Sequence, residues 1–195
     1  MISTERIIKW MNVVRHERGN RDRLLECFWD SQLLSKDWLC RSVPRLSDGK
    51  VVVHGAWYGT LAGMLLDTNS ISKIVCVDID PECARYVDMF NMDSRVSAVT
   101  VNMSDYEYTF IPDIVVNTSC EHIDDDTYVK WLENIPESSL IVLQSNNMYK
   151  VPDHINCSID IDDFIEKSLL ENITFSGQLE LPNGNTRFMI MGYKV

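Results

Sequence analysis

Two apolar runs joined through a glycine turn constrain this chain more than any other feature. The first run, residues 50–53, leads into the turn His54-Gly55-Ala56-Trp57-Tyr58-Gly59. The second run, residues 73–77, ends in Asp78, 19 positions after Gly59. This order predicts a buried strand, a tight turn, a helix and a second, parallel strand. In such units the glycines let the main chain approach a nucleotide and the acid binds ribose hydroxyls, so we expect a nucleoside-binding edge.

The size of the chain fits one folded unit. It has 195 residues, of which 45% are hydrophobic, enough for a single domain with a substantial core. We expect residues 1–195 to form that domain, with a helical lid over 1–44 and the sheet over 45–195. The first six residues are largely polar and no apolar run reaches the length of a membrane span, so we expect a cytoplasmic protein without membrane contact.

The cysteines indicate a reducing environment. There are six, and no two form a CxxC pair: Cys27, Cys40, Cys76, Cys83, Cys120 and Cys157. This scatter is typical of reduced residues and not of a zinc site or a disulfide framework. We therefore expect no bound metal.

The charge is strongly uneven along the chain. The net charge is −11, but residues 1–50 hold 10 Lys/Arg against 7 Asp/Glu, whereas residues 51–195 hold 8 against 22. An acidic body repels a phosphate backbone, so a nucleic-acid partner is not expected. The exception is a basic group in the leading segment, for which we favour a solvated helix face: Arg15, His16, Arg18, Arg21 and Arg23.

Apolar periodicity predicts alternating helices and strands after a helical start. The expected helices are 3–15, 21–35, 59–67, 81–91, 126–134 and 161–170, and a loop covers 41–49. The expected strands are 50–55, 73–78, 95–101, 113–118, 139–145, 173–181 and 187–193. The segment 181–185, Leu-Pro-Asn-Gly-Asn, predicts a hairpin between the last two. The fold class is therefore α/β, a doubly wound and mostly parallel seven-stranded sheet with an antiparallel C-terminal hairpin and N-terminal helices.

This order and spacing resemble the class I S-adenosylmethionine-dependent methyltransferase family over roughly residues 45–195. The resemblance places the glycine turn under the methionine part of the cofactor, Asp78 on its ribose, and 102–105 beside its adenine. It also implies that 113–123 are the fourth strand and its turn, where small-molecule members often carry a Glu-His pair. The implied cofactor is S-adenosylmethionine, and the implied binding residues are Gly55, Ala56, Trp57, Tyr58, Gly59, Asp78, Ile79, Asn102, Met103 and Asn117.

Two positions depart from the family pattern. The family usually has an acidic residue near the end of the first strand, where this chain has Val53, and a Gly-x-Gly-x-Gly turn, where this chain has Trp57 as the middle residue. The acid normally helps to hold the amino group of the cofactor. These departures support the alternative of a catalytically inactive methyltransferase-like binding or assembly module.

The candidate catalytic residues follow the fourth predicted strand. Asn117, Glu121 and His122 lie at its carboxyl end, where ligands bind in open α/β sheets. His122 could accept a proton from the nucleophile, and Glu121 could orient His122 or bind a substrate cation. Equally, Glu121 and the aspartates at 124–126 could be only an acidic cluster at a helix start.

We therefore expect a methyltransferase acting on a small or polar acceptor that the sequence does not identify. Trp10, Arg15, Arg18 and Arg21 could face that acceptor from the lid. A nicotinamide-dependent oxidoreductase is less favoured, because Gly55-x-x-x-Gly59 does not fit G-x-G-x-x-G. In addition, 195 residues are too few to include a second substrate domain, and the terminal hairpin has no role in that fold. A nucleic-acid methyltransferase using the arginines is a third possibility, disfavoured by the acidic body.

Overall fold

Seven strands form one mixed sheet in a computed structural model that describes residues 2–194. The order is β3-β2-β1-β4-β5-β7-β6, and only β7 runs antiparallel to both of its neighbours. The strands are β1 Gly49–His54, β2 Ile71–Asp78, β3 Val96–Thr100, β4 Ile114–Asn117, β5 Leu140–Asn146, β6 Asn172–Glu180 and β7 Thr186–Tyr193. The expected parallel sheet and terminal hairpin are confirmed.

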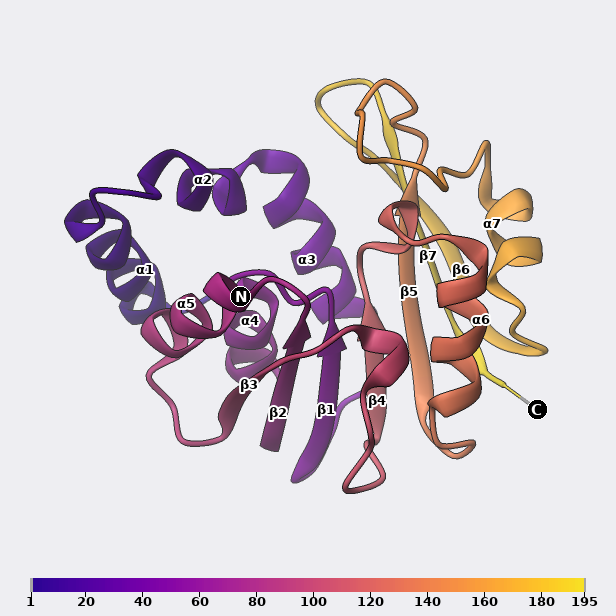
Figure 1. Ribbon diagram of the computed structural model, residues 1–195, viewed down its shortest axis with the longest axis horizontal. Coiled ribbons are helices and arrows are strands. Elements are labelled where there is room, and N and C mark those ends of the chain that lie inside the picture. Colours follow the sequence, from indigo (N-terminus) through magenta and orange to yellow (C-terminus); the bar gives the residue numbers. More distant parts are fainter. Residues whose placement is uncertain (1, 195) are drawn as a thin grey trace.

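Helices cover both faces of the sheet (Figure 1). The α-helices are α1 Thr4–His16, α2 Arg21–Leu25, α3 Asp30–Ser42, α4 Thr60–Thr68, α5 Pro81–Asn91, α6 Asp125–Asn134 and α7 Ile161–Ser168. Three single-turn 3₁₀ helices are η1 Glu26–Phe28, η2 Met103–Asp105 and η3 Cys120–His122. The first five α-helices pack in one core cluster, while α6 and α7 pack in another on the opposite face.

Alternation along the strands separates these two clusters. Val51 and Val53 of β1 face the cluster of α1–α5, whereas Val52 faces a smaller group with Tyr106. In β4, Val116 faces the first side and Val115 packs with α6. Successive side chains of a strand point to opposite faces, so strands buried on both sides appear as continuous apolar runs. The central strands are therefore covered by side chains on both faces.

Capping side chains fix where several helices begin. The Asp80 side chain accepts a hydrogen bond from the Glu82 N–H, and Pro81 occupies the first turn of α5 as expected. Asp124 caps α6 by accepting from the Thr127 N–H at 2.9 Å. Asp124 thus has a structural role at the start of α6. This agrees with the interpretation of the aspartates at 124–126 as an acidic cluster at a helix start.

The leading segment differs from its prediction. The single helix expected over 21–35 is interrupted at Trp29, whose extended ψ of 144° separates η1 from α3. Helix α3 then continues to Ser42, two residues into the predicted loop. It ends there because Pro44 disfavours a helical conformation at Val43. Within residues 2–194, no helix is both long and apolar enough to cross a membrane.

The suggestion that Trp10 faces an acceptor is wrong. Its side chain is 1% exposed and packs against Phe28 and Phe90, with ring centroids 5.7 and 6.2 Å away. Trp10 therefore anchors α1 to α5 and the rest of the core. The division of the chain into a lid over 1–44 and a core over 45–195 stays a prediction.

Candidate active site at the carboxyl edge of the sheet

Three adjoining cavities lie along the carboxyl edge of the sheet. An inner cavity of about 280 Å³ and a central cavity of about 760 Å³ share Gly55, Asp78, Ile79, Ser119 and His122. An outer cavity of about 560 Å³ shares Glu121, His122 and Arg187 with the central one. Because parallel strands end at this edge, residues distant in sequence meet here, as ligand sites in open α/β sheets require.

The glycine turn forms one wall of the inner and central cavities. Gly55 has φ of +58°, and a Cβ at this position would lie 3.0 Å from the Ser119 hydroxyl. A side chain would therefore both strain the backbone and close the space between the β1 and β4 turns. Trp57 lines the central cavity with a positive φ of +49°, and its indole stacks on the ring of Tyr58. The indole leaves the cavity open.

Asp78 ties the ends of β1 and β2 together. One carboxylate oxygen accepts a hydrogen bond from the Trp57 N–H at 2.7 Å, and the other accepts from the Asp80 N–H at 3.0 Å. Each carboxylate oxygen has two lone pairs, so both can accept one further hydrogen bond. The side chain lines both the inner and the central cavity, which is the placement a ribose-binding acid needs.

The inner cavity has an amide and an apolar surface on its far side. Asn102 caps η2, its side-chain oxygen accepting from the Ser104 N–H, and Met103 follows it. Both residues line the inner cavity together with the exposed Ile79. This combination suits a flat, partly polar ring such as a nucleobase.

A buried ion pair lies between the central and outer cavities. An Arg187 guanidinium nitrogen lies 2.8 Å from Glu121 Oε1, and the two side chains are 5% and 3% exposed. Asn146 also donates to this oxygen, at 2.6 Å. Glu121 is therefore neutralised by Arg187 and is not free to bind a substrate cation through Oε1.

A buried lysine faces the same central cavity. Lys36 of α3 lines it and donates to Gln32, one turn earlier. Burial lowers the pKa of Lys36 to about 8, because desolvation penalises the ammonium form. The leading helices thus contribute functional groups to this edge of the sheet.

Two histidines complete the site. His122 lines all three cavities, and its Nδ1 lies 3.0 Å from the Asp153 carbonyl oxygen. His154 lines the outer cavity, with its ring 4.5 Å from that of His122. Burial lowers the pKa of His154, which favours the neutral imidazole.

The structure divides the sequence-predicted site residues into two groups. Gly55, Ala56, Trp57, Asp78, Ile79, Asn102, Met103, Glu121 and His122 line the cavities. Tyr58, Gly59 and Asn117 lie behind the wall. Tyr58 is fully buried against Tyr86, Gly59 begins α4, and the Asn117 amide oxygen accepts from the Ser119 N–H at 2.9 Å. These three residues shape the turns and do not reach the inner or the central cavity.

Sequence reasoning missed Lys36, His154 and Arg187. Arg187 comes from β7, 66 positions after its partner Glu121, and no local pattern links them. His154 lies in the loop after β5, and no motif in the sequence marks it. The signal that could have found His154 is the position of its loop, which begins at the same carboxyl edge of the sheet as the other candidate residues.

Comparisons with known proteins now place the architecture. No protein-family model and no curated protein matches the sequence, but many solved structures share its fold. A chain from the complex between the Haloferax volcanii Trm112 methyltransferase activator and a methyltransferase superposes with a TM-score of 0.71 at 10% identity, over 95% of this chain and 98% of that one. Geranyl diphosphate methyltransferase in complex with SAM gives 0.67 at 12% identity, over 92% of each chain. This is the class I SAM-dependent methyltransferase fold.

Other neighbours are longer than this chain. Mitomycin 7-O-methyltransferase MmcR matches with a TM-score of 0.66 at 16% identity, over 94% of this chain but 60% of that one. The chain thus spans about three fifths of the length of this relative. At identities this low, the superpositions establish the class I fold alone. The acceptor has to be argued from the site.

Proposed function

We propose that this chain is an S-adenosylmethionine-dependent methyltransferase acting on a small or polar acceptor. The observation that carries the proposal is the pair of adjoining cavities divided by Gly55 and Asp78. The inner cavity would take the adenosine, and the central cavity would take the methionine part and the acceptor. The fit rests on the close approach that only glycine permits at position 55 and on the free lone pairs of Asp78.

The residues of the chain would act mainly by positioning. When bound, the cofactor supplies an electrophilic methyl group on a sulfonium, which leaves as a neutral thioether. Holding the two reactants in line contributes up to ~7–11 kcal/mol in favourable cases. Asp78, Ile79, Asn102 and Met103 would hold the nucleoside, and Trp57 would form the wall of the central cavity beside the methionine part. Tyr58, Gly59 and Asn117 would support these contacts from behind.

If the methyl-accepting group carries a proton, the reaction also needs a base to take up that proton. His122 is placed for this role because its Nδ1 faces the Asp153 carbonyl, which leaves Nε2 with a lone pair. Glu121 and Asn117 would act as positioning residues for the turn that carries His122.

Titration calorimetry with S-adenosylmethionine tests the proposal. We expect wild type to bind and Asp78→Ala to bind at least about tenfold more weakly, since a hydrogen bond to a charged group is worth about 1.5–3 kcal/mol. Asp126→Ala, an exposed acid in the first turn of α6, is the matched control and should bind like wild type. No heat with wild type would instead support the inactive binding or assembly module that Val53 and Trp57 suggest.

A further inference from the structure

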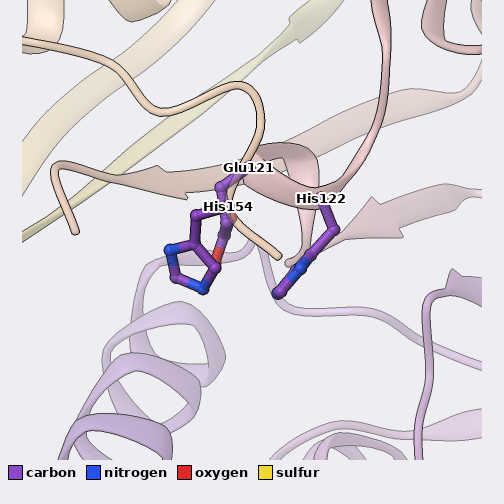
Figure 2. Close-up of side chains that lie close together, drawn as sticks. All are labelled: Glu121, His122 and His154. Carbon is purple, nitrogen blue, oxygen red and sulfur yellow. The ribbon is translucent and has the colours of Figure 1, made fainter. Parts of the chain in front are cut away.

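Three potential metal ligands converge between the central and outer cavities. Glu121 and His122 come from η3, and His154 comes from the loop after β5 (Figure 2). One donor atom from each lies within 4.8 Å of the other two. The cluster lies beside the space that the proposed function assigns to the acceptor.

The hydrogen bonds of the two histidines show that Nδ1 carries a hydrogen in both rings. The Asp153 carbonyl can only accept, so His122 Nδ1 must carry the hydrogen. The Asn146 side-chain oxygen accepts from the Met148 N–H at 2.8 Å, which identifies it as the acceptor end of that amide. His154 Nδ1, 3.1 Å from this oxygen, must therefore also donate. In its neutral form each imidazole therefore has its lone pair on Nε2, and each has the outer hydrogen bond that metal-binding histidines normally have.

The carboxylate of Glu121 has one oxygen without a partner. Oε1 accepts from Arg187 and Asn146, whereas Oε2 is buried and has no hydrogen-bond partner among the described residues. A buried carboxylate oxygen left unpaired costs free energy, which a cation at that position would offset. Arg187 balances the charge of the first oxygen without occupying the second.

We propose that Glu121, His122 and His154 bind one divalent transition metal ion. Two imidazole nitrogens and one carboxylate oxygen are a donor set typical of Zn²⁺, and less suited to Mg²⁺ or Ca²⁺, which prefer oxygen ligands. Zinc lies about 2.0–2.2 Å from such ligands, so donors up to 4.8 Å apart would have to move closer together by side-chain rotation to share one ion. Three protein ligands leave a fourth position open for a further ligand.

This inference deepens the proposed function and rests on it for the identity of the open ligand. An acceptor hydroxyl would bind at the open position, where the ion would lower its pKa, so that the hydroxyl would release its proton to solvent and be held as the alkoxide. His122 would then be a ligand, and the metal would replace it as the means of activating the nucleophile. The inference departs from the expectation, drawn from the cysteines, that no metal binds.

The test is titration of the metal-free protein, residues 1–195, with Zn²⁺ in the absence of S-adenosylmethionine. We expect wild type to take up one equivalent, and His122→Gln and His154→Gln each to bind at least about tenfold more weakly. His16→Gln makes the same chemical change on the exposed end of α1 and should bind like wild type. An equal concentration of Mg²⁺ should not displace the zinc.

Two outcomes would overturn the inference. One is the absence of a zinc equivalent in wild type, and the other is undiminished binding by both cluster variants. Far-UV circular dichroism of each variant excludes unfolding as the cause of lost binding. Asp78→Ala separates the two proposals, because it should lose the cofactor and keep the zinc. Zinc binding without cofactor binding would refute the methyltransferase, and the reverse would refute the metal site.

Discussion

At the scale of single residues, the buried pair of Glu121 and Arg187 makes a sharp prediction about stability. Replacing Arg187 by Met leaves the Glu121 charge buried without a partner, which typically costs about 3–5 kcal/mol. We expect the free energy of unfolding, measured by urea denaturation at pH 7, to fall by this amount. The double variant Glu121→Gln/Arg187→Met removes both charges and should recover part of the loss.

An exposed pair supplies the control for this prediction. Lys130 Nζ lies 2.6 Å from an Asp105 carboxylate oxygen, but both side chains are more than half exposed. Lys130→Ala should therefore lower the free energy of unfolding by less than ~1 kcal/mol. If Arg187→Met costs no more than Lys130→Ala, the buried pair does not stabilise the site.

Residues differ in how far the sequence could place them. Asp78 was predictable at the cavity because it ends an apolar strand a fixed distance after a glycine turn, and both signals are local. Arg187 was not, since its environment depends on β7 pairing antiparallel beside β5, with Arg187 opposite Asn146. The resemblance implies a cofactor contact for Tyr58 because Tyr58 belongs to the glycine turn, but its ring packs behind the turn on Tyr86.

At the scale of elements, we expect the turn into α4 to depend on close packing against α5. Gly59 begins the helix with φ of +75°, and an added Cβ would lie 2.9 Å from Asn91 and 3.1 Å from Val87 of α5. We expect Gly59→Ala to lower the free energy of unfolding by about 2–4 kcal/mol, since both strain and overpacking contribute. Urea denaturation measures the change.

Gly184 in the β6–β7 hairpin is the matched control for this turn. Its φ is +80°, but nothing lies within 4 Å of an added Cβ. Gly184→Ala should therefore cost only the backbone strain, about 1–2 kcal/mol. Equal losses in the two variants would show that α5 does not pack tightly against the Gly59 turn.

The elements themselves were mostly predictable, and the exceptions have a local cause. Strong periodicity and a capping residue located α5 to the residue, whereas the apolar spacing over 21–35 continued through a break at Trp29. There the Trp29 side chain is largely exposed, so an aromatic residue at the expected spacing did not mark a buried face. Periodicity alone could not separate η1 from α3.

At the scale of the whole molecule, the fold brings polar groups from separate segments to one edge. The glycine turn follows β1, Asp78 ends β2, His122 follows β4 and His154 follows β5. Parallel topology makes this gathering predictable, and loop conformation decides which side chains finally meet. The sheet also encloses polar groups in its core, and one of them links global stability to pH.

His54 should make the whole protein less stable as the pH falls. It ends β1 fully buried, with Nε2 2.8 Å from the Tyr108 hydroxyl, and burial lowers its pKa from the ordinary 6.5 to about 3. Between these values the unfolded chain binds a proton that the folded chain does not, so falling pH favours unfolding by roughly 1 kcal/mol per pH unit. We expect urea denaturation of wild type between pH 7 and pH 5 to show this slope, and His54→Gln to show a shallower one. His16→Gln, at an exposed histidine, should keep the wild-type slope. A slope unchanged in His54→Gln would mean that His54 is already protonated in the folded protein, or that other groups set the dependence. Either result would contradict a neutral, buried imidazole at the centre of the sheet.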